Sequence, residues 1–271
     1  MGETMAWVAV VATALLAFDA AVGRLARRGD ESTPARRMVQ GARVFALFLL
    51  AATLVTRCRG GETLLDDALC VAGFGVAGAL GLLLAQRIGF AVLRGLRAAV
   101  DAGNLAAGVA AGAHTAAIGI LIANATGGTT WTELGIAAIA FVVGQATLLL
   151  LVALFRWLTS YDDPAQILGG NTAAALSHGG LTIAIALVVA HASDGEFQGT
   201  WPAVRDFGIA LAESLVLWPL RQLLVQCVLL RGRPSLTGGP LDRAIERGDV
   251  GAGALEGTTY VALALLLRSL A

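Results

Sequence analysis

The sequence predicts an all-α integral membrane protein of about eight transmembrane helices, arranged as four parallel two-helix hairpin repeats. Of the 271 residues, 57% are hydrophobic and only 14% are charged, whereas soluble domains average about 25% charged residues. Several apolar runs reach the ~20 residues that a helix needs to cross a bilayer. These runs are continuously apolar rather than alternating, which favours helices over a β-barrel.

Eight spans are expected, and the loops between them are short, so residues 1–271 are interpreted as a single membrane domain. The spans are residues 5–22, 39–56, 67–86, 103–124, 133–157, 170–192, 204–230 and 248–268. The first run is expected to be a retained span rather than a signal peptide, because no positive charge precedes it and Asp19 interrupts its end.

The arginines are distributed unevenly between the two sides of the membrane. All nineteen basic residues are arginine, and fifteen of them flank the loops that join spans 1–2, 3–4, 5–6 and 7–8. Because cytoplasmic loops carry an excess of positive charge, these loops are expected in the cytoplasm and both termini on the outer side. Arg221 and Arg268, near span ends, are expected to extend to the nearer interface. The run "RLARRGDESTPARR" is explained by topology and anionic lipid, so no nucleic-acid partner is expected.

A Gly-Asn or Gly-Asp pair recurs along the chain, at Gly103-Asn104, Gly170-Asn171 and Gly248-Asp249, with a weaker match at Gln40-Gly41-Ala42. Each step covers two spans, which indicates four copies of a two-helix hairpin. The expected repeats are approximately residues 1–60, 61–128, 129–195 and 196–271. An even number of spans per repeat makes all four hairpins point the same way.

The polar residue of each pair begins a span. Asn104, Asn171 and Asp249 are therefore expected to cap backbone N–H groups, and a direct ligand role is the alternative. Small residues follow at matched positions and would let helix backbones approach closely in lipid. The glycines expected at these helix contacts are Gly108, Gly112, Gly179, Gly253 and Gly257.

Three ionisable residues inside spans are candidates for an ion or proton pathway, namely Glu213, Glu256 and His178. Titratable groups in a membrane are costly, and they usually face a bundle interior or a water-filled cavity. The competing interpretation is that they form hydrogen bonds across helices and fix the packing. Under the pathway hypothesis, replacement of Glu256 by Gln is expected to keep the fold.

The stretch "GGNTAAA" at 169–175, with Asp162 and Asp163 just upstream, resembles the bacterial domain-of-unknown-function family 350. The likeness is expected to cover residues ~65–271 as three hairpins. Asn104, Asn171 and Asp249 match the family's polar position, whereas Ala42 departs from it. The resemblance implies a bacterial inner-membrane protein of many spans, and it supplies no established substrate or catalytic residue.

Two functions stay open from the sequence. One is a small-ion or proton channel or transporter with a path among the repeats. The other is a non-catalytic membrane scaffold or membrane-stress component that binds partners through its cytoplasmic loops. No phosphate loop, nucleophile elbow or zinc-protease motif occurs, so an enzyme is not expected. No cofactor or metal is expected, and the expected partners are the lipid bilayer, small ions, further copies of the chain or other proteins.

Three cysteines, Cys58, Cys70 and Cys227, match no metal-binding or redox spacing. Cys58 and Cys70 would both lie near the outer face, where either a disulfide or two buried thiols would be compatible with the sequence.

Overall fold

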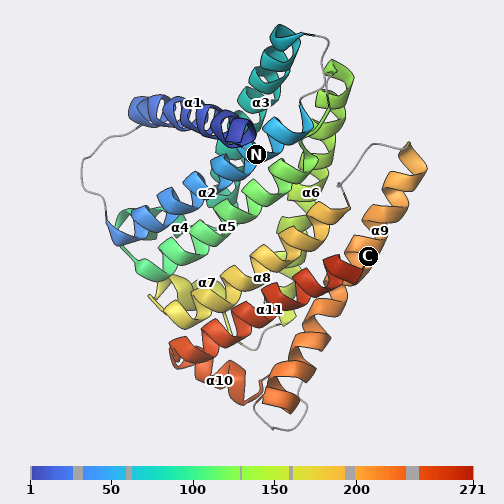
Figure 1. Cartoon of the computed structure of the whole chain (residues 1–271). Coiled ribbons are helices and arrows are strands. Elements are labelled where there is room, and N and C mark those ends of the chain that lie inside the picture. The colour runs from blue at the N-terminus through green and yellow to red at the C-terminus, as the bar shows by residue number, and fades with distance from the viewer. Residues whose placement is uncertain are drawn as a thin grey trace.

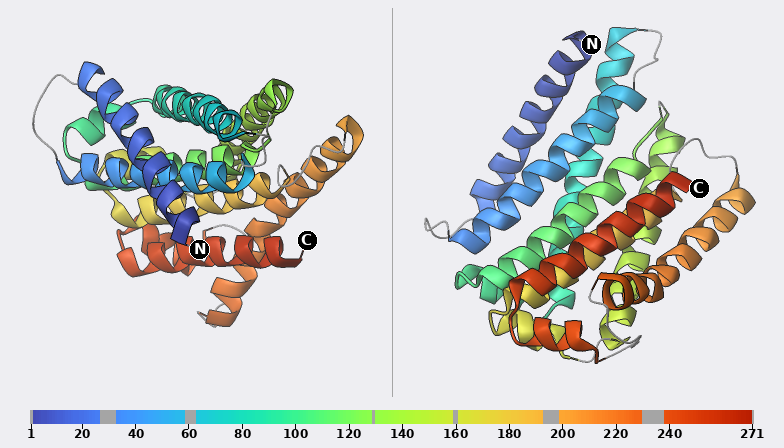
Figure 2. Two further views of the ribbon diagram at one scale, coloured as in Figure 1. Left: turned by 45° about the horizontal axis from the view of Figure 1, so that its top comes forward. Right: turned by 60° about the horizontal axis from the view of Figure 1, so that its bottom comes forward.

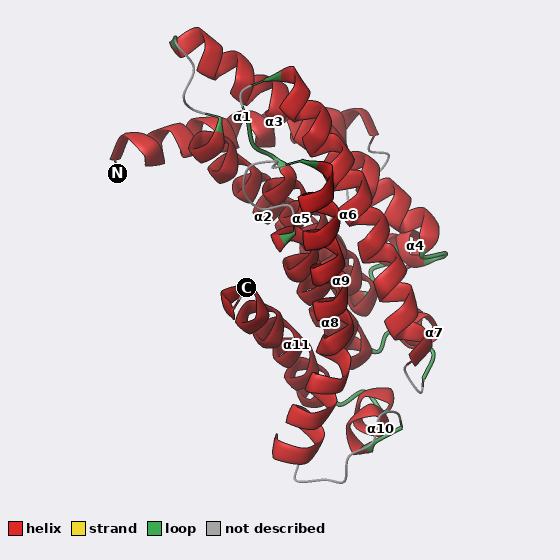
Figure 3. Ribbon diagram, turned by 90° about the vertical axis from the view of Figure 1, so that its right-hand side faces the viewer, coloured by secondary structure: helices red, strands yellow, loops and turns green. Residues whose placement is uncertain are grey.

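A computed structural model describes residues 2–26, 33–58, 63–128, 130–158, 161–192, 199–229 and 238–270. Within these ranges every regular element is a helix (Figure 3), which confirms the prediction of an all-α protein. The elements in chain order are α1 (Gly2–Ala26), α2 (Pro34–Arg57), α3 (Leu64–Val92), α4 (Leu96–Asp101), α5 (Leu105–Ala125), α6 (Trp131–Leu158), α7 (Asp163–Leu168), α8 (Thr172–His191), α9 (Thr200–Gln222), the π-helix η1 (Leu223–Leu229), α10 (Pro240–Glu246) and α11 (Val250–Leu270).

Seven of the described helices are long and apolar enough to cross a membrane: α2, α3, α5, α6, α8, α9 extended by η1, and α11. The eighth long helix is α1, whose fully described apolar stretch is Trp7–Ala21. The long helices lie where the apolar runs predict spans. Their ends differ from the expected bounds by a few residues, most of all at the start of α2 and the end of α3.

Four of the long helices, α2, α5, α8 and α11, lie side by side as a row through the molecule (Figure 1). Three others pack on successive pairs of the row: α3 on α2 and α5, α6 on α5 and α8, and α9 on α8 and α11. In the right-hand view of Figure 2, α2 and α11 lie towards opposite ends of this row, and both chain termini lie at the end away from α10. The row is therefore open rather than closed into a ring.

Small residues allow the helices of the row to approach closely. A Cβ added at Gly108 would meet the backbone of Ala35 at 2.5 Å, and one added at Gly257 would lie 2.5 Å from the carbonyl oxygen of Leu176. Gly179 faces Ala113 in the same way, and Gly112 lies against the Met38 carbonyl.

Further small residues extend these contacts. Gly253 of α11 lies against the Ala173 carbonyl of α8, where a Cβ would collide. An equally close approach, which was not predicted, brings Gly180 of α8 against Gly257 of α11. Backbone contact of this kind supplies the dispersion energy that holds helices together in lipid.

Three short helices that the sequence analysis did not predict, α4, α7 and α10, each precede a member of the row. Each ends at a glycine with positive φ: Gly103 at +88°, Gly170 at +92° and Gly248 at +87°. The residue after the glycine donates its backbone N–H five residues back, as Asn171 does to the Gln166 carbonyl at 2.9 Å. This is the Schellman ending, which places glycine in the left-handed region. One Gly-Asn pair therefore ends a short helix and starts a long one.

The first member of the row is capped by a different residue from the one expected. Gly41 lies inside α2 rather than before it, and the N-cap is Thr33, whose Oγ1 accepts from the Arg36 N–H at 3.3 Å. The match of Gln40-Gly41-Ala42 to the motif was therefore wrong. A Thr-Pro start is a strong signal for a helix, because Thr caps and Pro fits the first turn.

Candidate functional site

A buried ion pair joins α9 to α11. Arg221 Nη2 pairs with Glu256 Oε1, and the two side chains are 3% and 1% exposed. The second carboxylate oxygen accepts a hydrogen bond from Ser177 Oγ of α8 at 2.7 Å. Arg221 also donates from Nε to the Tyr260 hydroxyl at 3.0 Å, with its guanidinium carbon 5.1 Å from the centroid of the Tyr260 ring. These four side chains form what is here called the α8–α9–α11 cluster.

Local structure explains why these residues meet. Ser177 lies six residues after the cap of α8, and Glu256 lies seven residues after the cap of α11. At a rise of 1.5 Å per residue, both lie about 10 Å along their helices from the capped ends. Tyr260 follows Glu256 by one turn and therefore lies on the same face of α11. Arg221 comes two residues after Pro219, which lies inside α9, and the helix continues as the π-helix η1. Proline removes a backbone hydrogen bond, which favours such a local change of winding.

The pairing corrects the expectation that Arg221 extends to an interface. Arg221 is 2% exposed and is compensated inside the protein instead. A charge taken out of water loses several kcal/mol of solvation, and a close partner offsets that loss only when the remaining polar atoms are also satisfied. Removal of the Glu256 carboxylate alone would leave a buried cation, so Glu256→Gln is no longer expected to be silent for stability.

A second acid lies beside the cluster at the end of the molecule that carries the short helices. Asp163 begins α7 and is buried, and its carboxyl interacts with Tyr161 and with Arg156 of α6. Tyr161 interacts in turn with Ser177. Burial raises the pKa of Asp163 from 3.8 to about 7, although the Arg156 charge opposes the shift. Burial, followed by the negative charge of Asp163, raises the pKa of Tyr161 as well.

Some buried polar atoms of α9 and η1 have no partner among the described residues. These are Arg221 Nη1, Ser214 Oγ and both side-chain polar atoms of Gln226. Ser214 lies two helical turns before Arg221, about 10 Å along α9. Buried polar groups without protein partners are the places where ordered water binds.

The motif asparagines make contacts in two directions. Asn104 Oδ1 accepts from the Ala107 N–H at 3.1 Å and caps α5, while its Nδ2 donates to the Ile167 and Leu168 carbonyls at the end of α7. Asn171 caps α8 through the Ala174 N–H, and its Nδ2 donates to Ile245 at the end of α10 at 2.8 Å. Each amide therefore ties one member of the row to the short helix that follows next in the chain.

Asp249 caps α11 by accepting from the Ala252 N–H at 3.1 Å. A carboxylate has no N–H to donate, and no further short helix follows α11 in the described chain. At the other end of the row, Thr33 Oγ1 caps α2 and lies 3.5 Å from the Val100 carbonyl of α4. These contacts favour the capping interpretation over a ligand role.

No hydrogen bond or ion pair between described residues joins the three pathway candidates to one another. Glu256 contacts Ser177 and Arg221, whereas Glu213 of α9 is half-buried. His178 of α8 is buried and lines a cavity beside α7, and its Nδ1 has no partner among the described residues.

A separate polar group ties α1, α2, α3 and α5 together. Arg43 of α2 pairs with Asp19 of α1 at 3.4 Å and donates to Gln86 of α3, which donates to Thr115 of α5 at 2.9 Å. This group was not predicted, since its members are far apart in sequence. It contains one compensated ion pair and is interpreted as a tie between helices.

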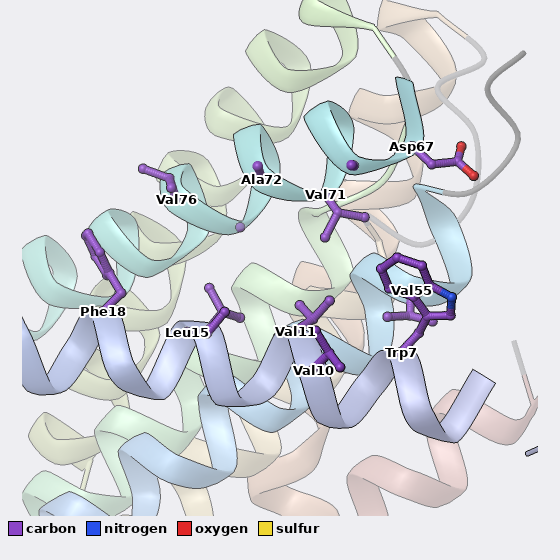
Figure 4. Close-up of a pocket in the computed structure, with 13 residues that line it drawn as sticks. Trp7, Val10, Val11, Leu15, Phe18, Val55, Asp67, Val71, Ala72 and Val76 are labelled. Carbon is purple, nitrogen blue, oxygen red and sulfur yellow. The ribbon is translucent and has the colours of Figure 1, made fainter. Parts of the chain in front are cut away.

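A cavity of about 300 Å³ lies between α1 and α3. Val11, Leu15 and Phe18 of α1 face Val71 and Val76 of α3 across it (Figure 4). Its walls are almost wholly apolar.

Cys58 and Cys70 are free thiols and lie close enough to interact. Burial raises the pKa of Cys58 to about 12, which keeps the thiol protonated. Among the residues with described positions, no group of three or more His, Cys, Asp or Glu side chains could hold a metal ion.

The fold and the buried charges define a multi-helix membrane protein with an ionisable cluster between three of its spans. The family model "Domain of Unknown Function (DUF350)" matches residues 129–270, which comprise α6 to α11, and the chain belongs to this family. The match contains the whole α8–α9–α11 cluster. It begins at residue 129, so it does not cover residues 65–128, which the resemblance was expected to include. No curated protein and no solved structure matches the chain.

Proposed function

We propose that this protein conducts protons or another small cation across a membrane, with Glu256 as the ionisable group of the path. The observation that carries the proposal is the α8–α9–α11 cluster, in which a carboxylate and a guanidinium are buried together inside spans. The close backbone contacts within the row are made by small residues, so this packing does not itself require a charge at this level. Ionisable residues at such positions commonly mark proton or ion pathways.

The entrance is the Asp163 carboxyl. A pKa of about 7 lets this acid exchange protons near neutral pH. Tyr161 and Ser177 lie between Asp163 and Glu256, and hydroxyl groups both donate and accept, so they can relay a proton. Water at Arg221 Nη1 and Ser214 Oγ would continue the path along α9.

The orientation belongs to the same proposal. The arginine distribution favours the short-helix end in the cytoplasm and both termini outside, and the family resemblance favours a bacterial inner membrane. Four parallel hairpins, one for each member of the row, would then present Asp163 to the cytoplasm.

A scaffold is the second candidate, and one observation favours it. The Arg221–Glu256 pair is compensated, and it connects α9 and α11 while Ser177 connects α8. Such a cluster can fix the arrangement of helices without moving any charge. The two candidates differ in whether the protein carries a current.

The test is flux into proteoliposomes that contain a pH-sensitive dye, driven by an imposed membrane potential. The double variant Glu256→Gln/Arg221→Gln removes the acid and leaves no buried charge, so folding is preserved while the proton site is lost. We expect flux from the parent, loss of most of it in the double variant, and parental flux in Glu246→Gln, which neutralises an exposed acid of α10. The Glu213→Gln variant tests the other acid among the pathway candidates.

Parent flux no higher than that of empty liposomes would overturn the transport proposal and leave the scaffold. Full flux in a folded double variant would remove Glu256 from the path.

A further inference from the structure

The cavity beside His178 differs in chemistry from the apolar groove between α1 and α3. It has a volume of about 270 Å³ and lies where the α3–α4 turn, α5, α6, α7 and α8 meet, at the short-helix end. Three basic side chains line it: Arg94 from the turn, Arg156 from α6 and His178 from α8. They come from three separate segments, so the fold gathers them.

The histidine is the deepest polar group of this cavity. His178 is 4% exposed, and its Nδ1 has no partner among the described residues. A buried ring nitrogen without a partner is costly, because it has lost water and gained nothing in exchange. An oxygen atom of a bound group in the cavity would accept a hydrogen bond from this nitrogen.

The two arginines set the charge of the expected ligand. The Arg156 guanidinium acts electrostatically on the His178 ring, and Arg94 is exposed beside the cavity. Arg156 also interacts with Asp163, but a guanidinium has five N–H donors and can serve both groups. Guanidinium groups bind phosphate oxygens in pairs of parallel hydrogen bonds.

The remaining walls of the cavity are apolar. Val92 and Leu168 are 57% and 38% exposed at its edge, and Leu93 and Ile167 also line it. A cavity near the lower size limit of ligand pockets holds a headgroup rather than a large molecule. Apolar side chains at the mouth would contact acyl chains of a lipid whose headgroup lies inside.

We propose that this cavity binds the phosphate group of an anionic ligand, with Arg94, Arg156 and His178 as its donors. Two sources share this chemistry: a phospholipid headgroup of the surrounding leaflet and a soluble phosphate. Basic pockets between spans on the cytoplasmic side are suited to anionic headgroups. The site shares Arg156 with Asp163, the proposed entrance of the path, but binding of an anion here does not require that the protein carries ions.

The experiment has two arms on the full-length purified protein. In the lipid arm, native mass spectrometry measures binding of phosphatidylglycerol and of diacylglycerol with the same acyl chains. In the soluble arm, inorganic phosphate is titrated against thermal unfolding at constant ionic strength, with chloride as the reference.

The informative variants are Arg94→Gln and His178→Phe, which remove donors while keeping side-chain bulk. Arg97→Gln is the matched control, since Arg97 is an exposed arginine three residues away that does not line the cavity. We expect one arm to show binding that each informative variant weakens by about tenfold, as the loss of one charge-assisted or buried hydrogen bond predicts. Arg97→Gln is expected to bind like the parent.

The site is assigned to a phospholipid if the protein binds phosphatidylglycerol more tightly than diacylglycerol and the informative variants weaken that binding. The site is assigned to a soluble phosphate if inorganic phosphate raises the unfolding temperature and the informative variants weaken that effect. Absence of binding in both arms overturns the proposal. So does binding that the three variants weaken equally, because that would be general surface charge. Circular dichroism confirms that each variant is folded.

Discussion

At the scale of single residues, the buried carboxyl of Asp163 makes stability depend on pH. Its pKa is raised from 3.8 to about 7, chiefly by burial. Between these values the unfolded chain has released the proton while the folded protein still holds it. The folded state therefore binds more protons, and the free energy of unfolding falls as pH rises from about 4 to about 7.

We predict that Asp163→Asn removes part of this fall, because the amide stays neutral at every pH. Thermal unfolding of detergent-solubilised protein from pH 4 to pH 8 measures it, with an expected difference of roughly a few kcal/mol across the window. Asp162→Asn is the control, since Asp162 is exposed and Asn also caps α7. Identical pH profiles for parent and Asp163→Asn would contradict the burial of this acid in its neutral form.

Residue-level prediction from sequence succeeded where the signal was local. Asn104, Asn171 and Asp249 begin helices because a short polar side chain before an apolar run caps it. The second function of the asparagines, donation to the end of the next short helix, was missed. Its partners are carbonyls more than sixty residues away, and nothing in the local pattern indicates them. The one sequence signal for this contact was that the last motif has Asp249 where the first two have asparagine.

At the scale of elements, the asparagine of each Gly-Asn pair joins a member of the row to a short helix. We predict that Asn171→Asp is destabilising by about 1–3 kcal/mol, because it keeps the cap but places a carboxylate against the Ile245 and Glu246 carbonyls. Asp249→Asn is expected to stay within about 0.5 kcal/mol of the parent, because it caps equally well and has no carbonyl partner to lose. Thermal unfolding of both variants makes the comparison. Equal effects of the two substitutions would refute the link to α10.

Close backbone approach between α8 and α11 is the second feature at this scale. We predict that Gly180→Ala costs about 1–3 kcal/mol, because the new methyl group would collide with the backbone of Gly257. Gly208→Ala is the matched control: its site has nothing within 4 Å, and alanine favours helix by up to about 1 kcal/mol. Thermal unfolding of the two variants tests this prediction. If Gly180→Ala is as stable as Gly208→Ala, α8 and α11 lie farther apart than the structure shows.

The short helices α4, α7 and α10 could have been predicted. Two of them have a proline in the first turn, Pro164 in α7 and Pro240 in α10, and all three end two residues before a glycine that adopts positive φ. Proline near a helix start and glycine past its end are the usual signals. They were overlooked because each helix has only six or seven residues, below the length at which apolar periodicity is visible.

At the scale of the whole molecule, the row of four helices has an end. Asn104 and Asn171 each contact the next short helix, whereas Asp249 offers only acceptors. Asp249 therefore cannot make this contact, and α11 is the last member of the row in the part of the chain that the structure describes. Hydrophobic runs and arginine counts predicted the long helices but not this open arrangement, because they carry no information on which helices are neighbours.

The α8–α9–α11 cluster was only half predictable for the same reason. The sequence identifies Glu256 as an acid within a span, and it places Arg221 near the end of another. Their pairing depends on how α9 crosses α8 and α11 after Pro219, which is set by tertiary packing. An arginine two residues beyond a proline within an apolar run was the available hint.

A double-mutant cycle on Arg221 and Glu256 tests this central ion pair most directly. Thermal unfolding is measured for the parent, Arg221→Gln, Glu256→Gln and the double variant in one detergent. Each single variant leaves a buried charge without its counter-charge and is predicted to lose about 3–5 kcal/mol, while the double variant leaves no such charge and loses less than either single variant. A double variant whose loss equals the sum of the two single losses would mean that the two side chains do not interact, and the cluster would have to be abandoned.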